Sequence, residues 1–346
     1  MAEHLMIISD AWHPQTNGVV RTLEAIKADM ENRGFEVSMV TPDAFWTVPV
    51  PTYPEIKLAL TLPGTVAQLI TRKKPDYIHI ATEGPLGFAA RMHCERAGLN
   101  FTTSYHTRFP EYLSARLPVP EDVPYAFLKW FHWPASAMLV PTITVANELL
   151  DRGFRKANLW TRGVETGAFH PGPKSLFSDL PGPHLLCVGR VAIEKNIEAF
   201  LRLEIEGSKI VVGDGPQLET LKAAYPSVHF LGLKKGADLR AAYQSADAFV
   251  FPSKTDTFGN VMLEALACGT PVAAYPVTGP IDVITDRRAG ALDNDLGAAV
   301  RAALQLSRHD AHRFSQQFTW KRATDIFHNH LAPVRAVPAG LPVAVA

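Results

Sequence analysis

Ser253-Lys254-Thr255-Asp256-Thr257-Phe258-Gly259-Asn260-Val261-Met262-Leu263-Glu264-Ala265-Leu266-Ala267-Cys268-Gly269 is the stretch that decides the fold. It follows the apolar run 248–251, which is typical of a buried parallel strand. The pattern predicts a polar loop and then a helix that is capped by Asp256 or Thr257 and ends at Gly269. A helix N-terminus attracts anions through its free backbone N–H groups and its dipole. The stretch therefore predicts an anion site at the end of a strand.

Two carboxylates frame this predicted site. Asp256 precedes the helix, and Glu264 lies inside it. A carboxylate on an otherwise apolar helix face costs desolvation free energy unless it meets a polar partner, and sugar hydroxyls are such partners. The alternative is that Asp256 only caps the helix and Glu264 only faces solvent. The rest of the chain favours the first interpretation.

The composition indicates a globular protein and limits its partners. With 346 residues, of which 47% are hydrophobic, the chain is long enough for two domains of roughly 150 residues each. Its 34 Lys and Arg balance 34 Asp and Glu, which argues against a nucleic-acid partner held by excess positive charge. Three widely spaced cysteines, Cys94, Cys187 and Cys268, indicate a reducing compartment. Without a signal-peptide pattern or an apolar run of about 18 residues, we expect a protein that is neither exported nor membrane-spanning.

Apolar runs, turns and amphipathic helices alternate along the chain, which is the signature of parallel α/β sheets. In the first half this predicts strands at residues 5–8, 37–40, 77–80, 101–104, 137–140 and 158–161, and helices at 19–32, 85–97, 123–133 and 144–152. In the second half it predicts strands at 185–188, 209–212, 228–231, 248–251 and 271–274, and helices at 197–203, 217–225, 239–245 and 321–331. We therefore expect domains at 1–163 and 185–318, a Gly/Pro-rich linker at 164–184, a C-terminal helix at 319–332 and a loose tail at 333–346.

Two aromatic stretches stand out from this alternation. Residues 45–62 carry Trp46, Tyr53 and several prolines and are predicted to form a long irregular loop, which in a compact domain is usually functional or mobile. The second stretch holds Phe127, Trp130, Phe131 and Trp133. Such residues favour a bilayer interface, although a buried core helix explains them equally well. Both interpretations stay open at this point.

Cationic residues follow the first strand of the second half. Arg190 and Lys195 lie five positions apart in a loop that begins at Gly189 and runs into a helix. Such a pair can converge on one phosphate group, with Arg as a bidentate fork and Lys as a point charge, and could neutralise a leaving diphosphate. The alternative is a pair that only faces solvent.

Other ligand motifs are scarce in the sequence. No G-x-G-x-x-G follows residues 5–8 and no G-x-x-x-x-G-K-[ST] occurs, which weakens the dehydrogenase and NTPase interpretations. The acidic triplet 293–295 lies among turn residues and is interpreted as a loop, so no metal site is predicted. His106 closes a predicted strand at the carboxyl edge of the first sheet, where open α/β folds bind ligands. Asn17-Gly18 and residues 83–85 should lie along the same edge.

Three elements in order resemble those of family 4 of the retaining GT-B glycosyltransferases, and the resemblance covers nearly the whole chain. They are Gly189-Arg190 to Lys195, Gly213-Asp214-Gly215-Pro216, and Asp256 to Gly269. The resemblance implies an α/β protein with two Rossmann-like domains whose parallel sheets face an interdomain cleft, and a final helix that crosses back to the first domain. It implies a nucleoside-diphosphate sugar as co-substrate, held mainly by the second domain, and an acceptor held by the first domain. It implies no cofactor and no metal.

The same resemblance implies roles for individual residues. Arg190 and Lys195, in the loop from Gly189, would bind the diphosphate, Glu264 the ribose and Asp256 the hydroxyls of the donor sugar. His106 would contact the sugar near the reacting carbon, so that His106, Arg190, Lys195 and Asp256 are the expected catalytic residues. The remaining expected donor-binding residues are Asn17 and Gly18, then Leu233 and Lys234 at the edge of the base, and the backbone of Phe258, Gly259, Asn260 and Val261 at the phosphates.

Departures from the family pattern are few. Asp256 stands where the family usually has Glu, Asn196 where Gly is common, and Asn17-Gly18 where many members have Gly-Gly. The amino-acid sequences of residues 17–21, 54–60 and 255–259 are similar to those of lipid glycosyltransferases and related mannosyltransferases.

The resemblance to this subgroup implies retaining transfer of a hexose, of the glucose, galactose or glucuronate type, from a UDP-sugar to a membrane lipid such as diacylglycerol. The enzyme would be metal-independent, cytoplasmic and peripheral on the inner face of the cell membrane. Three alternatives stay open. They are a GDP-mannose-dependent α-mannosyltransferase acting on a lipid or polysaccharide, a nucleotide-sugar 2-epimerase of the same fold, and a catalytically silent sugar-nucleotide-binding module.

Overall fold

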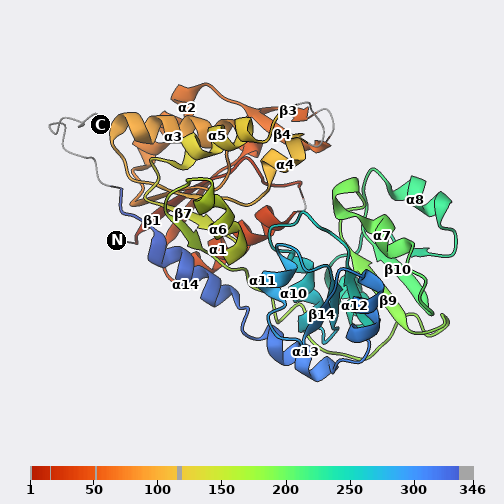
Figure 1. The fold of residues 1–346 in the computed structure, drawn as a ribbon. Helices are drawn as coiled ribbons and strands as arrows, with labels where there is room; N and C mark the ends of the chain where they lie inside the picture. The colour runs from red at the N-terminus through yellow and green to blue at the C-terminus, as the bar shows by residue number, and fades with distance from the viewer. Residues whose placement is uncertain (1, 16, 51–52, 115–118, 335–346) are drawn as a thin grey trace. The chain divides into compact units, whose positions relative to one another are not determined.

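A computed structural model describes residues 2–15, 17–50, 53–114 and 119–334. The chain divides into two compact units, each with its own parallel sheet (Figure 1). Unit 1 consists of Met1–Pro141, Ala146–Trp160 and Ala323–Ala346, and unit 2 of Thr142–Val145 and Thr161–Arg322. The predicted α/β class with two Rossmann-like domains is thereby confirmed.

The sheet of unit 1 has six parallel strands in the order β2-β1-β5-β6-β7-β8. The strands are β1 (His4–Ile8), β2 (Glu36–Val40), β5 (Tyr77–Ile80), β6 (Thr102–Ser104), β7 (Ala137–Val140) and β8 (Ala157–Leu159). From β1 the chain first moves to β2 on one side and then returns to the other side of β1 for β5. The order of the strands therefore reverses between β1 and β5.

Helices cover both faces of this sheet, because successive residues of a buried strand point to opposite faces. Leu5 and Ile7 pack in one cluster with residues of α1 (Gly18–Asn32) and with Phe327 of α14 (Trp320–His330). Met6 and Ile8 pack in the other cluster with residues of α2 (Pro63–Lys73), α3 (Pro85–Ala97) and α5 (Asp122–His132). The remaining helices of the first half are α4 (Phe109–Ser114) and α6 (Ile143–Asp151), with a 3-10 turn at Pro42–Ala44.

The sheet of unit 2 repeats this plan, with six parallel strands in the order β11-β10-β9-β12-β13-β14. The strands are β9 (His184–Val188), β10 (Ser208–Val212), β11 (His229–Phe230), β12 (Ala248–Phe251), β13 (Val272–Ala274) and β14 (Gly290–Leu292). The helices are α7 (Ile197–Leu201), α8 (Leu218–Ala224), α9 (Gly236–Ser245), α10 (Asn260–Ala267), α11 (Pro280–Val283), α12 (Leu296–Ala303) and α13 (Arg308–Ser315). Here the strand order reverses between β9 and β12.

The prediction of an irregular loop at residues 45–62 is wrong. β3 (Trp46–Val50) and β4 (Tyr53–Leu60) form an antiparallel hairpin in which Trp46 pairs with Leu60, and residues 51–52 lie outside the described part. The prolines suggested a loop because proline cannot donate to a ladder inside a sheet. A two-stranded hairpin has only edge strands, so its prolines can turn outward without loss of a hydrogen bond.

The predicted cap of the helix after β12 is also wrong. α10 has Gly259 as its N-cap, with φ of 88° and no side-chain hydrogen bond to the first turn. Asp256 and Thr257 therefore lie before the cap, and Asp256 pairs with a lysine instead. Six further elements were not predicted from the sequence, because their short or interrupted apolar patterns are weak signals of secondary structure. They are α2, α4, α11, α12, α13 and β14.

The segment that connects the two sheets in the sequence packs on unit 2. The Phe169 ring packs on Tyr243, and the Leu176 amide donates to Ser245 Oγ. In unit 1, Trp160 Nε1 donates to the carbonyl of Ala323 in α14 at 3.1 Å. None of the helices in the described part of the chain has the length and apolar character that crossing a membrane requires. Most of the predicted tail, from residue 335 onward, lies outside the described residues.

Candidate active site

The loops after β9 and β12 meet at the reversal point of the unit 2 sheet. Thr255 and Ser253 donate their hydroxyl hydrogen bonds to the carbonyl of Glu194, and Asn196 Nδ2 donates to the carbonyl of Pro252. The crevice outside the carboxyl ends of strands at such a point is the usual ligand site of open α/β sheets. The two loops that carry the expected diphosphate and sugar contacts are thus joined side by side.

Lys195 and Asp256 form an ion pair between these loops. Lys195 Nζ lies 2.5 Å from Asp256 Oδ1, and the two side chains are 27% and 16% exposed. Asp256 Oδ2 is buried and has no hydrogen-bond partner among the described residues. A buried carboxylate oxygen without a partner is costly, so a hydroxyl group that donates to it would be bound favourably.

Arg190 lies half-buried at the start of the same loop. The backbone around it is braced by the turn at residues 213–216, because the Val191 amide donates to the carbonyl of Asp214 and the Gln217 amide to the carbonyl of Val191. The Gly-Asp-Gly-Pro turn therefore supports the cationic loop. This explains why the two motifs occur together in the sequence.

Glu264 is buried, with 6% of its surface exposed, and Oε2 accepts a hydrogen bond of 2.9 Å from the Tyr243 hydroxyl. The alternative in which Glu264 only faces solvent is therefore wrong. This hydrogen bond fixes the direction of the Glu264 carboxylate. Tyr243, on α9, was not singled out by the sequence analysis.

The first turn of α10 offers backbone N–H groups at the same end of the sheet. Gly259, the N-cap, has no side chain that could bind these groups, and Phe258, 6% exposed, anchors the preceding loop in the core with Phe251 and Met262. Leu233 and Lys234 lie beyond β11, where Leu233 is exposed and Lys234 is half-buried. Within the described residues no hydrogen bond or ion pair joins these two residues to the loops after β9 and β12.

The expected site residues of unit 1 lie along the carboxyl edge of its sheet. Asn17 caps α1, since its Oδ1 accepts hydrogen bonds of 3.0 Å from the amides of Val19 and Val20. His106 follows β6, is half-buried, and packs edge-on against Trp160 with 5.7 Å between ring centroids. Asn17, Gly18 and His106 thus belong to one unit, and the other expected residues belong to the other.

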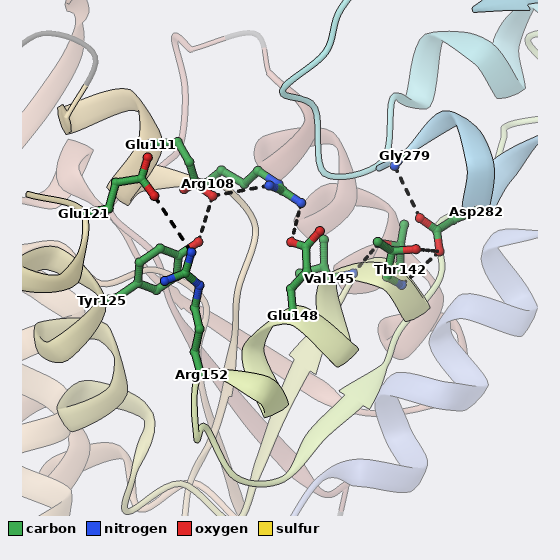
Figure 2. Close-up of polar contacts among 11 residues, drawn as sticks. Arg108, Glu111, Glu121, Tyr125, Thr142, Val145, Glu148, Arg152, Gly279 and Asp282 are labelled. Carbon is green, nitrogen blue, oxygen red and sulfur yellow. Dashed lines mark hydrogen bonds and ion pairs between the residues drawn. The ribbon is translucent and has the colours of Figure 1, made fainter. Parts of the chain in front are cut away.

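Arg108 is the centre of a charged network that the sequence analysis did not predict (Figure 2). Its guanidinium forms ion pairs with Glu148 of α6 and, at 3.3 Å, with Glu111 of α4. The Tyr125 hydroxyl donates to Glu111 at 2.8 Å, and burial together with this bond raises the pKa of Tyr125 to about 12. The network fixes the segment after His106, and its only sequence signal is the position of Arg108 beyond the strand.

A second carboxylate that the prediction missed is Asp282, in unit 2. Its Oδ1 accepts hydrogen bonds from the amide and the hydroxyl of Thr144 at 3.0 and 2.9 Å, and its Oδ2 accepts from the Gly279 amide at 3.3 Å (Figure 2). Asp282 therefore holds the loop before α11 in place. Among the residues that the structure describes, no group of three His, Cys, Asp or Glu is arranged to hold a metal ion.

Comparison with known proteins places both halves of the chain in one enzyme family. The family model described as Glycosyltransferase Family 4 matches residues 16–167, and the model described as Glycosyl transferases group 1 matches residues 182–309.

Similar curated proteins point the same way. The GDP-mannose-dependent alpha-mannosyltransferase of Mycobacterium tuberculosis is 28% identical over 311 residues, which are 83% of this chain and 82% of the relative. Sulfoquinovosyl transferase SQD2 of Arabidopsis thaliana is 31% identical over 294 residues, 75% of this chain and 57% of the relative. Alpha-monoglucosyldiacylglycerol synthase of Streptococcus pneumoniae is 26% identical over 342 residues, 86% of this chain and 77% of the relative.

Solved structures share the fold at low sequence identity. Sucrose-phosphate synthase from Thermosynechococcus elongatus superposes with a TM-score of 0.73 at 19% identity, over 94% of this chain and 98% of that chain. Anabaena Alr3699/HepE in complex with UDP-glucose gives 0.69 at 16% identity, also over 94% and 98%. The chain belongs to the family 4 glycosyltransferases and has their GT-B fold of two Rossmann-like domains.

Proposed function

We propose that this glycosyltransferase moves a hexose, of the glucose, galactose or glucuronate type, from a UDP-sugar to a membrane lipid such as diacylglycerol, with retention of anomeric configuration. The observation that carries the proposal is the Lys195–Asp256 pair at the reversal point of the unit 2 sheet, beside the N-terminus of α10. The names of the relatives, among them an alpha-monoglucosyldiacylglycerol synthase, support a sugar donor and a lipid acceptor.

The chemistry follows from where charge develops. When the bond between the anomeric carbon and the leaving oxygen breaks, both electrons go to the β-phosphate of the nucleoside diphosphate. Arg190, Lys195 and the N–H groups of α10 would stabilise this charge at no cost of reorganisation. Because these groups supply the positive charge, the proposed transfer reaction requires no metal ion.

The carboxylates hold the sugar and the nucleotide in this scheme. Asp256 Oδ2 would accept a hydrogen bond from a hydroxyl of the donor sugar, and Glu264 one from the ribose. His106 would contact the sugar near the anomeric carbon. The acceptor oxygen forms its bond on the face from which the diphosphate leaves, and its proton passes to the departing phosphate oxygen, so the configuration is retained.

Contact with a membrane surface is part of the proposal, because a diacylglycerol acceptor lies in a bilayer. On the hairpin, Trp46 and Leu60 are 87% and 59% exposed, and Leu62, at the start of α2, is 77% exposed. On α5, Trp130 is 42% exposed, whereas Phe131 is fully buried. Exposed aromatic and aliphatic side chains of this kind favour the bilayer interface. We therefore place the enzyme in the cytoplasm, peripheral on the inner face of the cell membrane.

A GDP-mannose-dependent α-mannosyltransferase is the second candidate function. The observation that favours it is the name of the Mycobacterium tuberculosis relative, which aligns over 83% of this chain. In either case Leu233 and Lys234, beyond β11, would edge the base. A 2-epimerase of the same fold would convert the donor without an acceptor.

One experiment tests these proposals together. Purified protein is incubated with a panel of UDP- and GDP-sugars and extracted membrane lipids, and products are identified by mass spectrometry. The proposal expects a hexosyl lipid that forms only with a UDP-sugar. A mannosyl product from GDP-mannose would establish the second candidate instead. Release of nucleotide without any glycosylated lipid, or an epimerised donor, would refute the lipid-transfer proposal.

A further inference from the structure

The two sheets carry their reversal points at equivalent places. In unit 2 the loops after β9 and β12 flank this point and hold Lys195 and Asp256. In unit 1 the loops after β1 and β5 flank it, and they hold Asp10 and Glu83. Ligands of open α/β sheets bind outside the carboxyl ends of strands at such a point. Asp10 and Glu83 are therefore the carboxylates of unit 1 that lie where a ligand would bind.

Asp10 is fully engaged within the protein. It is 7% exposed and accepts hydrogen bonds from the amides of Leu86 and Gly87 at 2.8 and 3.2 Å and from the Thr82 hydroxyl at 2.9 Å. A Cβ at Gly84 would lie 2.4 Å from Asp10 Cγ, so the loop is packed directly against this carboxyl. Asp10 thus fixes the backbone on both sides of Glu83 and has no oxygen left for a ligand.

Glu83 is held by one oxygen only. Its Oε1 lies 3.2 Å from His132 Nε2, and His132 Nδ1 lies 2.9 Å from the Thr103 hydroxyl. A carboxylate only accepts, so Nε2 of His132 carries a proton and donates to Glu83. The His132 side chain is 2% exposed and that of Glu83 is 24% exposed. Glu83 Oε2 takes part in no hydrogen bond within the described part of the chain.

This geometry is that of a prepared acceptor of hydrogen bonds. A buried histidine orients a carboxylate at the ligand edge, a rigid loop holds its backbone, and one oxygen stays available. We infer that Glu83 binds a hydroxyl group of the acceptor and that His132 is its positioning residue. The inference rests on the proposed function, since it assumes that an acceptor with hydroxyl groups is the second substrate.

The charge at this edge also favours one class of acceptor. Burial raises the pKa of Asp10, and repulsion from the nearby Glu83 carboxylate raises it further. An anionic headgroup beside Glu83 would meet the same repulsion, whereas sugar and glycerol hydroxyls donate to carboxylates. The hydroxyl that Glu83 binds therefore belongs to an uncharged polyol, such as glycerol or a neutral hexose.

Binding of octyl β-glucoside, an uncharged amphiphile with hydroxyl groups, tests the inference without any reaction. Its dissociation constant for the full chain is measured by saturation-transfer NMR, and the donor nucleotide is titrated separately by calorimetry. We expect Glu83→Gln to weaken octyl glucoside binding about tenfold, as for loss of a hydrogen bond to a charged group, and to leave nucleotide binding unchanged. The matched control is Glu36→Gln, which removes a carboxylate 4.0 Å from His4 at the amino edge of the same sheet.

His132 requires a measurement that a purely structural role would not move. His132→Phe should weaken octyl glucoside binding about tenfold with nucleotide binding retained, and His132→Gln, which can still donate to Glu83, should recover most of the affinity. No octyl glucoside binding by the wild type, equal binding by Glu83→Gln, or equal loss in Glu36→Gln would overturn the inference. Glucoside binding that depends on Glu83, together with no transfer to any lipid, would instead refute the proposed function alone.

Discussion

Lys195 Nζ lies 2.5 Å from Asp256 Oδ1, although the two residues are 61 positions apart in the chain. The pair joins the loops that follow two neighbouring strands, β9 and β12. Because both side chains are partly exposed, the pair contributes little to stability, at most about 1 kcal/mol. In the proposed function the pair lies beside a helix N-terminus to bind a sugar diphosphate.

Lys195→Ala is expected to lower kcat/KM for transfer about a thousandfold, since it removes a cation from the charge that develops on the leaving phosphate. The melting temperature should change by only a few degrees, because the ion pair is partly exposed. Steady-state transfer assays and thermal unfolding measure the two effects. Lys254→Ala is the control, because this exposed lysine lies on the loop after β12 with its Nζ 4.3 Å from the Tyr275 ring centroid. Near-normal turnover by Lys195→Ala would count against the proposed chemistry.

Glu264→Gln is expected to weaken nucleotide-sugar binding by about ten- to a hundredfold, because the carboxylate is buried and aimed by Tyr243. Tyr243→Phe keeps the carboxylate but not its partner, so it should weaken binding less, by about fivefold. Calorimetric titration with UDP-glucose and GDP-mannose gives both values. Unchanged affinity in both variants would show that Glu264 lies outside the donor site.

Gly259→Ala is expected to destabilise the protein by about 1–3 kcal/mol. Gly259 has φ of +88°, and an added Cβ would lie 2.8 Å from Met262 Cε and 2.9 Å from Phe251 Cζ. Gly64, in α2, has nothing within 4 Å of an added Cβ, so Gly64→Ala should be neutral or stabilising. Urea unfolding of both variants decides the matter. Equal stability of the two would contradict the strained cap.

Replacing Trp46 and Leu62 with serine should reduce the recovery of the protein with floated anionic liposomes, because these two side chains are 87% and 77% exposed. We expect recovery to fall at least threefold without loss of thermal stability, since neither residue is in a core cluster. Leu159→Ser, which changes a 44% exposed leucine on β8, serves as control. Failure of the wild type to float would favour an acceptor outside the membrane.

His79 makes stability depend on pH. Burial lowers the pKa of His79 to about 3, and its ring packs edge-on against Trp160 and Phe327 and forms hydrogen bonds with Thr102 and Ser104. Above the ordinary histidine pKa of about 6.5, the His79 imidazole is neutral in both the folded and the unfolded state. Below that pH, and above about 3, the imidazole takes up a proton only in the unfolded state. Stability should therefore fall by about 2 kcal/mol between pH 7 and pH 5.

The contribution of His79 can be isolated by substitution. In His79→Gln the amide can take over one hydrogen bond and does not titrate, so urea unfolding should lose most of this pH dependence. His309→Gln changes a histidine side chain that is 72% exposed and should behave like the wild type. An unchanged pH slope in His79→Gln would show that other groups cause it.

Much of the fold was readable from local patterns. Except for β14 and α2, the strands of both sheets and the longer helices were predicted within a few residues, because a buried parallel strand is a short apolar run and its helix has a clear amphipathic period. The hairpin at residues 46–60 was not predicted, because its prolines are typical of a loop. The cap of α10 was misplaced because Asp256 is a good cap by type, and only the contact with Lys195 shows its other partner.

The candidate site was only partly readable in the same way. Arg190, Lys195 and Asp256 lie in loops that follow strands, and Glu264 lies within the helix after such a loop, so their placement is visible in the sequence. Tyr243, His132 and Asp282 act on residues many positions away, so no local spacing reveals them.

By itself the sequence determined the class of fold, the two halves and the loops that carry charge, because these depend on the order of apolar and polar residues along the chain. Only the tertiary structure decided which loops are neighbours. Strand order is set by how helices pack on the two faces of each sheet, and it places Lys195 beside Asp256 and the loop of Glu83 beside that of Asp10. Contacts between residues far apart in the chain arise from that packing, which no local pattern encodes.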